Sequence, residues 1–130
     1  MTLTYHLRVN YEDTDFSGFV YHANYLKFCE RARSDYLRVK GVDQKAMFAE
    51  GTAFVVRRMD CNFLSPARFE DELTVETDFR EMHGARFELF QTIKRGADTL
   101  FTAAVTVVLI DGQGRPTRIT PDLAVALTHS

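Results

Sequence analysis

Residues 22–41 read HANYLKFCERARSDYLRVKG and carry the longest helical pattern in the chain. Apolar side chains recur there at spacings of three and four residues, whereas Lys27, Arg31 and Arg38 fall on another side. The recurring apolar positions are Tyr25, Phe28, Cys29, Ala32, Tyr36 and Leu37. This periodicity predicts a helix of about five turns that begins near His22 and ends at Gly41. Because its apolar face is broad, we expect the helix to lie across a sheet.

Alternating apolar and polar residues predict strands on both sides of this helix. Residues 3–9 alternate before it, and residues 73–79 and 86–93 alternate after it. Residues 54–64 are also predicted to form a strand, because they mix β-branched and aromatic side chains. Glycines at His83-Gly84 and within residues 95–98 predict hairpin turns between three of these strands. Residues 100–110 are almost continuously apolar, which predicts a central strand buried on both faces.

Two short helices complete the expected elements. Asp43 is placed to cap a helix that runs through Ala49 and closes at Gly51. Thr120 and Pro121 supply a cap and a first-turn proline ahead of a helix over residues 122–127. The order of elements predicts an α+β fold in residues 1–130, one domain with an antiparallel sheet of about five strands wrapped around one main helix. Hairpin turns leave no room for the crossovers of a parallel sheet.

Composition and charge exclude several classes of protein. Sixteen basic and eighteen acidic residues give a net charge of −2, so we expect no nucleic-acid partner. The longest uncharged run, residues 99–110, is too short for a membrane helix, so no transmembrane segment is expected. The first residues resemble neither a secretory signal nor a transit peptide, which predicts a cytoplasmic location. Cys29 and Cys61 lack metal-ligand spacing, so we expect packed, reduced thiols and neither a metal nor a cofactor.

Chemistry-bearing residues gather in residues 11–25, YEDTDFSGFVYHANY. The carboxylates of Glu12, Asp13 and Asp15 precede Gly18, and His22 stands at the expected helix start. A helix N-terminus carries about half a positive charge and free N–H groups, so it can stabilise an oxyanion next to an attacking carboxylate. The arrangement suits acyl transfer. A structural explanation stays open, in which an aspartate only caps the helix or a turn and Gly18 only supplies a positive φ.

A longer set of residues carries a family resemblance. It runs through residues 8–33, which include the pattern T-D-x-x-G-x-V-Y-H-x-x-Y, and continues through residues 53–59 and 66–68. This sequence resembles the hot-dog-fold acyl-CoA thioesterases, and most of all the YbgC type associated with the Tol-Pal envelope system. That type lies within the 4-hydroxybenzoyl-CoA thioesterase-like superfamily. The resemblance covers most of the chain in matching order.

The resemblance implies a hot-dog fold and a site. It implies that Asp15 is the catalytic carboxylate, either as nucleophile or as general base on water, and that His22 orients the thioester carbonyl or the water. The other oxyanion or substrate-positioning residues that it implies are Gly18, Tyr21, Ala23 and Tyr25. As a general base, Asp15 would gain from a pKa raised by burial.

Three charged residues outside residues 11–25 also match the family. Glu30 lies about 12 Å beyond His22 along a helix, so we expect it to pair with Arg33 or with a partner subunit rather than to catalyse. Arg57 and Arg58 are expected to alternate across a strand, so that one of them contacts coenzyme A phosphates or a carrier protein.

The expected function is therefore hydrolysis of acyl thioesters of coenzyme A or acyl carrier protein, with acyl chain length left undetermined. One alternative is a hot-dog hydratase or dehydratase, although the usual Asp-x-x-x-x-His spacing is absent because Asp15 and His22 are seven residues apart. Another is a non-catalytic adaptor that binds acyl carrier protein. The resemblance also implies a homo-oligomer, either a dimer or a dimer of dimers (a homotetramer), that covers the open sheet edge.

Overall fold

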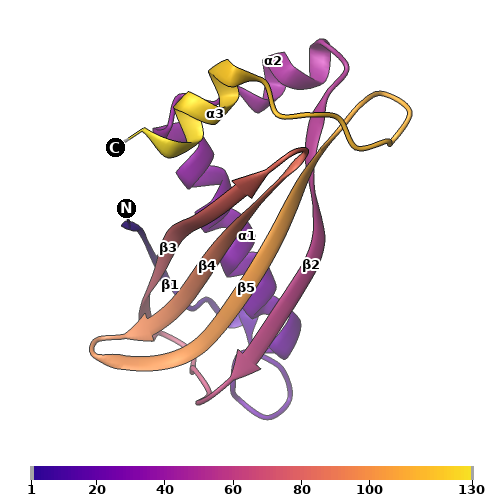
Figure 1. Ribbon diagram of the computed structural model, residues 1–130. Coiled ribbons are helices and arrows are strands. Elements are labelled where there is room, and N and C mark those ends of the chain that lie inside the picture. Colours follow the sequence, from indigo (N-terminus) through magenta and orange to yellow (C-terminus); the bar gives the residue numbers. More distant parts are fainter. Residues whose placement is uncertain (1, 130) are drawn as a thin grey trace.

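One antiparallel sheet of five strands packs against a single long helix (Figure 1). The computed structural model describes residues 2–129 of the chain. The strands are β1 (Thr2–Arg8), β2 (Ala53–Phe63), β3 (Glu72–His83), β4 (Arg86–Arg95) and β5 (Asp98–Ile110). The helices are α1 (His22–Val39), α2 (Gln44–Ala49) and α3 (Pro121–Thr128), and a short 3-10 turn covers Tyr11–Asp13. The predicted α+β class and the strand number are confirmed.

The strands lie in the order β1-β3-β4-β5-β2, so β1 and β2 form the two edges of the sheet. Every neighbouring pair is antiparallel. In β3 the alternation is as predicted, because Leu73, Val75 and Thr77 are buried while the residues between them are partly exposed. The sheet therefore has one face against α1 and one face turned away from it (Figure 1).

The prediction that β5 is buried on both faces is wrong over most of its length. Ala104 is exposed and Thr102 and Thr106 are partly exposed, whereas Ala103 and Val105 are buried. The strand has a neighbour on each side, but α1 covers only one face, so small residues on the other face stay accessible. The continuous apolar run of β5 correctly predicted that the strand lies inside the sheet, but it wrongly predicted that both faces of the strand are buried.

Helix α1 buries the predicted face. Its buried residues are Asn24, Tyr25, Phe28, Cys29, Ala32, Tyr36 and Leu37. The helix ends where Gly41 adopts φ +80°, and the Gly41 N–H donates to the Arg38 carbonyl at 3.0 Å. This left-handed position is the usual terminator of a helix and fits glycine best. The predicted end is therefore confirmed to within two residues.

Both short helices begin at the predicted caps. The Asp43 side chain accepts a hydrogen bond from the Ala46 N–H at 3.0 Å. The Thr120 hydroxyl accepts one from the Leu123 N–H at 3.3 Å, with Pro121 in the first turn of α3. Each cap satisfies one of the N–H groups that a helix start leaves free.

A buried amide joins the middle of α1 to the sheet. Gln91 on β4 is fully buried, and its Nε2 donates to the Cys29 carbonyl of α1 and to the Thr77 hydroxyl of β3, each at 3.0 Å. Cys29 is itself buried, which raises the pKa of its thiol to about 12, and neither it nor Cys61 forms a disulfide. These bonds fix the position of α1 along the sheet, and with it the position of the helix N-terminus.

Within the residues that the structure describes, no helix combines the length and the apolar character needed to cross a membrane.

Candidate active site

The loop between β1 and α1 folds into a tight turn that presents Asp15. The Asp15 N–H donates to the Phe19 carbonyl and the Gly18 N–H donates to the Asp15 carbonyl, each at 3.0 Å. Thr14 and Val20 pair as an isolated antiparallel bridge at the base of this turn. Gly18 has φ +85°, a conformation that L side chains rarely adopt, so the turn requires glycine at this position.

The Asp15 carboxylate is exposed at the tip of this turn and is held by one neighbour. Its Oδ1 accepts hydrogen bonds from the Ser17 hydroxyl at 2.5 Å and from the Ser17 N–H at 2.8 Å. The hydroxyl contributes most, then the N–H, and with the nearby His22 they lower the pKa of Asp15 below its ordinary value. The shift is opposite to the one that a general base would gain from, because the Asp15 carboxylate is exposed and its slight desolvation raises the pKa less than the Ser17 bonds lower it.

Asp13, two residues earlier, is a buried structural carboxylate. Its Oδ1 accepts from the Asn24 side chain at 2.9 Å, and its Oδ2 accepts from the Asn10 N–H at 2.8 Å. Its backbone carbonyl also accepts from the Tyr21 N–H at 2.8 Å. Asp13 therefore ties the loop to the first turn of α1. The sequence left open that an aspartate of this loop only caps the helix or a turn, and Asp13 has such a structural role. Its bond to Asn24 was not predicted, although a polar Asn24 one helical turn before buried Phe28 was an available signal.

The start of α1 keeps two backbone donors open. Tyr21 is the N-cap residue and its side chain makes no capping hydrogen bond. Among the hydrogen bonds of residues 2–129, none is donated by the N–H of His22 or Ala23. Unsatisfied N–H groups at a helix N-terminus favour a negative charge or an oxyanion. Both Tyr21 and His22 are exposed there, with their ring centroids 4.5 Å apart, and the His22 ring meets Phe63 edge-on at 6.5 Å.

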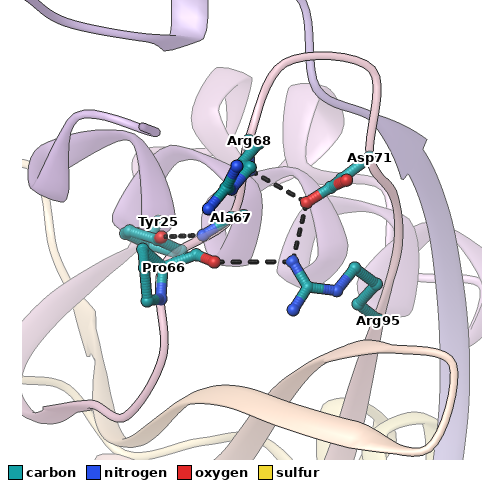
Figure 2. Close-up of polar contacts among 6 residues, drawn as sticks. All are labelled: Tyr25, Pro66, Ala67, Arg68, Asp71 and Arg95. Carbon is teal, nitrogen blue, oxygen red and sulfur yellow. Dashed lines mark hydrogen bonds and ion pairs between the residues drawn. The ribbon is translucent and has the colours of Figure 1, made fainter. Parts of the chain in front are cut away.

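A second loop, residues 64–71, supports the first one. Figure 2 shows the Tyr25 side chain of α1 reaching this loop, where its hydroxyl accepts a hydrogen bond from the Ala67 N–H at 2.9 Å. The Ala67 carbonyl in turn accepts from the Val20 N–H at 2.9 Å. Tyr25 is only 4% exposed and stacks on Phe101 at 5.3 Å. It therefore lies beneath the site surface and connects the helix to both loops.

An ion pair closes this second loop (Figure 2). Asp71 accepts hydrogen bonds from the Arg95 guanidinium at 2.8 Å and from the Arg68 N–H at 2.9 Å. Arg95 also donates to the Pro66 carbonyl at 3.4 Å. Burial alone would raise the pKa of Asp71, but the bonds from Arg68 and Arg95 outweigh it and lower that pKa. The loop is thus held at both ends independently of any ligand.

Glu30 does not pair with Arg33, so that part of the prediction is wrong. Its carboxylate accepts a hydrogen bond from the Ser34 hydroxyl one turn along the helix at 3.0 Å. The residues described form no ion pair between Glu30 and Arg33, because Arg33 donates instead to Gln91 at 3.0 Å.

The expected alternation of Arg57 and Arg58 is interrupted. The register of β2 against β5 shifts between Val56 and Arg58, so Arg57 is the extra residue of a β-bulge. Arg58 forms an ion pair with Asp60 on the same strand at 3.3 Å. Arg57 is exposed, and no ion pair is formed by it among residues 2–129. A bulge redirects side chains, so simple alternation does not decide which arginine faces a groove.

The structure thus brings the carboxylate of Asp15, the ring of His22 and the open N–H groups of α1 to one end of the helix. Gly18 shapes the turn, and Tyr25 supports it from below. In the described part of the chain, no cluster of His, Cys, Asp or Glu side chains is arranged to hold a metal ion. Such a site offers an anionic carboxylate beside backbone donors for an oxyanion, which are the groups that acyl transfer uses.

Known proteins share this sequence and fold. The model of the "Thioesterase-like superfamily" matches residues 9–127. The acyl-CoA thioester hydrolase YbgC of Escherichia coli O6:H1 is 42% identical over 121 residues, which is 92% of this chain and 90% of that protein. The acyl-CoA thioesterase YbgC of Haemophilus influenzae is 38% identical over 125 residues, or 95% and 92% of the two chains.

Solved structures of thioesterases have the same fold as this chain. A probable thioesterase from Bartonella henselae superposes with a TM-score of 0.88 at 42% identity, covering 92% of this chain and all of that one. A 1,4-dihydroxy-2-naphthoyl-CoA thioesterase from Synechocystis superposes with a TM-score of 0.91, over 99% and 97% of the two chains, at 22% identity, which shows the fold. The neighbours confirm the predicted hot-dog fold. The chain is a member of the thioesterase-like superfamily.

Proposed function

We propose that the chain hydrolyses acyl-CoA thioesters and that Asp15 is its catalytic carboxylate. One observation carries the proposal: an exposed, ionised carboxylate stands directly before a helix N-terminus with open N–H donors. The relatives that cover almost the whole chain are named acyl-CoA thioester hydrolases, which supports the same reaction here. No observation favours the hydratase or the adaptor alternative.

In this proposal Asp15 acts as the nucleophile. A carboxylate oxygen attacks the thioester carbonyl carbon, the carbon–sulfur bond breaks, and the thiolate of coenzyme A leaves and takes a proton from solvent. Water then hydrolyses the resulting mixed anhydride to the free acid and regenerates the carboxylate. The lowered pKa of Asp15 supports this route over general-base catalysis, because it keeps the group ionised but makes it a weaker proton acceptor.

The other site residues position the substrate. The N–H groups of His22 and Ala23 receive the developing oxyanion, and the His22 ring orients the carbonyl. Gly18 allows the acyl thioester to approach the main chain. The N-cap residue Tyr21 flanks the entry, and Tyr25 acts through the loop that it holds at Ala67. Each assignment uses the helix N-terminus as a site preorganised for negative charge.

Arg57 is our proposed contact for the phosphates of coenzyme A. It is exposed and lies at a bulge, whereas Arg58 is engaged with Asp60. Arginine matches phosphate geometry and remains charged at all working pH values. An acyl group on acyl carrier protein would present the same phosphopantetheine phosphate, so acyl carrier protein is a second proposed substrate carrier.

We further propose that two copies pair along β2. This edge strand exposes Val55, Val56 and Phe63, and an exposed apolar edge favours pairing with another strand. Such a pair would build a dimer, and two dimers a homotetramer. A cytoplasmic location and an association with the Tol-Pal system belong to the same proposal, and they rest on the resemblance of residues 8–33 to the YbgC type and on the character of the first residues.

The reaction is tested by measuring free thiol released from acyl-CoA substrates that range from acetyl to palmitoyl and include aryl acyl groups. Hydrolysis releases one thiol for each acid formed. An enoyl-CoA included in the panel separates the reactions, because a hydratase would remove its conjugated absorbance without releasing thiol. Absence of thiol release from every member would contradict the proposed function.

A further inference from the structure

Arg33 in the middle of α1 is held in one orientation by the fully buried amide of Gln91. Its Nη1 donates to Gln91 Oε1 at 3.0 Å. The amide cannot turn, because its nitrogen already donates to the Cys29 carbonyl and the Thr77 hydroxyl. The guanidinium is therefore positioned by a polar network that spans α1, β3 and β4. Because its planar set of N–H donors is held in one orientation, it is preorganised to bind a ligand.

Among the described residues this guanidinium forms no ion pair, and the nearby Glu30 carboxylate acts on it only from a greater distance. Among residues 2–129, no carboxylate lies within ion-pair distance of Arg33. Its partial burial lowers the pKa of Arg33, because desolvation disfavours the charged form. Arginine has five N–H donors, and Gln91 uses only one of them. A partly buried charge without a counter-ion is costly unless a ligand pairs with it.

The same side chain lines a pocket of about 120 Å³ between α1, the start of β2 and the inner faces of β4 and β5. Its apolar wall consists of Leu37, Phe54, Val55, Val56, Phe87, Leu89 and Val107. Val55 and Val56 also belong to the β2 edge at which a second copy is proposed to pair, so in that dimer the pocket lies beside the partner. Phe54 and Phe87 meet edge-on in this wall, with centroids 5.2 Å apart. The pocket thus pairs a compact apolar volume with one fixed cation, the combination that binds small amphipathic anions.

We propose that this pocket binds a carboxylate carried on a compact apolar body, with the carboxylate paired to Arg33. The inference rests on the proposed function, since thioester hydrolysis produces acids of this kind. Two sources share the chemistry: the free acid product, and a carboxylate at the far end of a bound acyl group. A bidentate guanidinium–carboxylate pair uses the donors that Gln91 leaves open.

Removing the charge of Glu30 tests whether Arg33 binds an anion, because the expected change is an increase in affinity. The Glu30 carboxylate also lines the pocket, where Ser34 holds it at 3.0 Å. A negative charge beside Arg33 weakens anion binding there, so removing it strengthens binding. A merely structural Arg33 would not respond in this way.

The direct experiment is calorimetric titration of the full chain with hexanoate and benzoate, and with the uncharged hexanamide and benzamide. The acids bind, and the amides bind at least about tenfold more weakly because they lack the charge. Arg33→Lys weakens acid binding by about tenfold, because a lysine cannot form the bidentate pair. Glu30→Gln, an exposed position that keeps the fold, tightens acid binding by about threefold.

The proposal is overturned if amides and acids bind alike, or if Glu30→Gln leaves acid binding unchanged. It is also overturned if Arg33→Lys changes only the sedimentation coefficient, because a second copy would then supply the anion. Repeating the titration with Asp15→Asn separates the two proposals. If Asp15→Asn still binds the acids but no longer hydrolyses thioesters, both the pocket and the proposed function are supported. If the wild type binds the acids but hydrolyses no thioester, only the proposed function is contradicted.

Turnover assays distinguish the two sources. If the source is a distal carboxylate, adipyl-CoA is preferred over hexanoyl-CoA, and Arg33→Lys reduces that ratio of kcat/KM by about tenfold. If the source is the free acid, hexanoate inhibits hydrolysis of hexanoyl-CoA and Arg33→Lys relieves the inhibition. Either result supports the pocket, and the absence of both contradicts it.

Discussion

The buried Asp13 carboxylate accepts a hydrogen bond from the Asn24 side chain at 2.9 Å, which fastens the loop before α1 to the first turn of that helix. The carboxylate of Asp15, two residues later, is exposed, and among residues 2–129 it accepts hydrogen bonds from Ser17 alone. Two carboxylates in one short loop therefore have different tasks. Asp13 holds the turn in place, and Asp15 stays exposed for the chemistry that we propose for it.

Asn24→Ala should destabilise the fold through Asp13. The substitution leaves a buried carboxylate oxygen without its side-chain donor, so we expect the free energy of unfolding to fall by about 2–3 kcal/mol. Urea unfolding measures this change. Lys27→Ala, at an exposed position on the same helix, is the control and should stay within about 0.5 kcal/mol of wild type. Equal effects of the two substitutions would contradict the role given to Asp13.

Gly18→Ala should damage the site through backbone strain alone. No atom lies within 4 Å of the added Cβ, so its cost of about 1 kcal/mol comes from the φ of +85°. We expect kcat/KM to fall at least tenfold as the turn that presents Asp15 shifts. Gly18→Asn, which tolerates this conformation better, should retain more activity. The two variants are compared by thiol release and by thermal unfolding.

Ser17→Ala should raise the pKa of Asp15. The hydroxyl is the main cause of the lowered pKa, and its loss leaves only the Ser17 N–H and the electrostatic effect of nearby His22 to lower it. Carbon-detected NMR titration of the Asp15 carboxyl group measures the shift directly. Because the nucleophile must be ionised, the acidic limb of kcat/KM should move to higher pH in the same variant. A limb that stays in place while the carboxyl pKa rises would assign the limb to another group.

Arg95→Gln should reduce stability in a pH-dependent manner. The pKa of Asp71 is lowered in the folded chain, so its contribution to stability is fully present above the ordinary aspartate value of 3.8 and is lost as the pH falls through the folded pKa. The difference in free energy of unfolding between wild type and Arg95→Gln is therefore largest near neutral pH. It should shrink below about pH 4, as urea unfolding at several pH values would show. A difference that is independent of pH would contradict the ion pair with Asp71.

Much of this fold could be predicted because local chemistry repeats along the chain. The bounds of α1 follow from apolar spacing and from Gly41, and the caps of α2 and α3 follow from Asp43 and Thr120. Two-sided burial of β5 was predicted wrongly, since periodicity reports the character of the side chains and not which faces other elements cover. Which face of β5 is buried depends on where α1 packs against the sheet, and the sequence of β5 does not contain that information.

The site was predictable in part. The motif located Asp15, Gly18 and His22 at one end of the helix, and the structure places them there. The bonds between Asp13 and Asn24 and between Tyr25 and Ala67 join residues 11 and 42 positions apart, and no local pattern encodes such contacts. The β-bulge at Arg57 likewise depends on pairing with β5, so alternation counted along the sequence could not reveal it.

The central claim is that Asp15 performs the chemistry, and the measurement that tests it most directly is kcat/KM for thiol release by Asp15→Asn. Glu12→Gln is the matched control, because it neutralises an exposed carboxylate of the same loop. We expect Asp15→Asn to lose at least about a thousandfold in kcat/KM, since the amide cannot replace the attacking carboxylate. Its thermal stability should match wild type, and Glu12→Gln should remain within a few-fold of wild-type activity. Activity of Asp15→Asn within a few-fold of wild type would contradict the account.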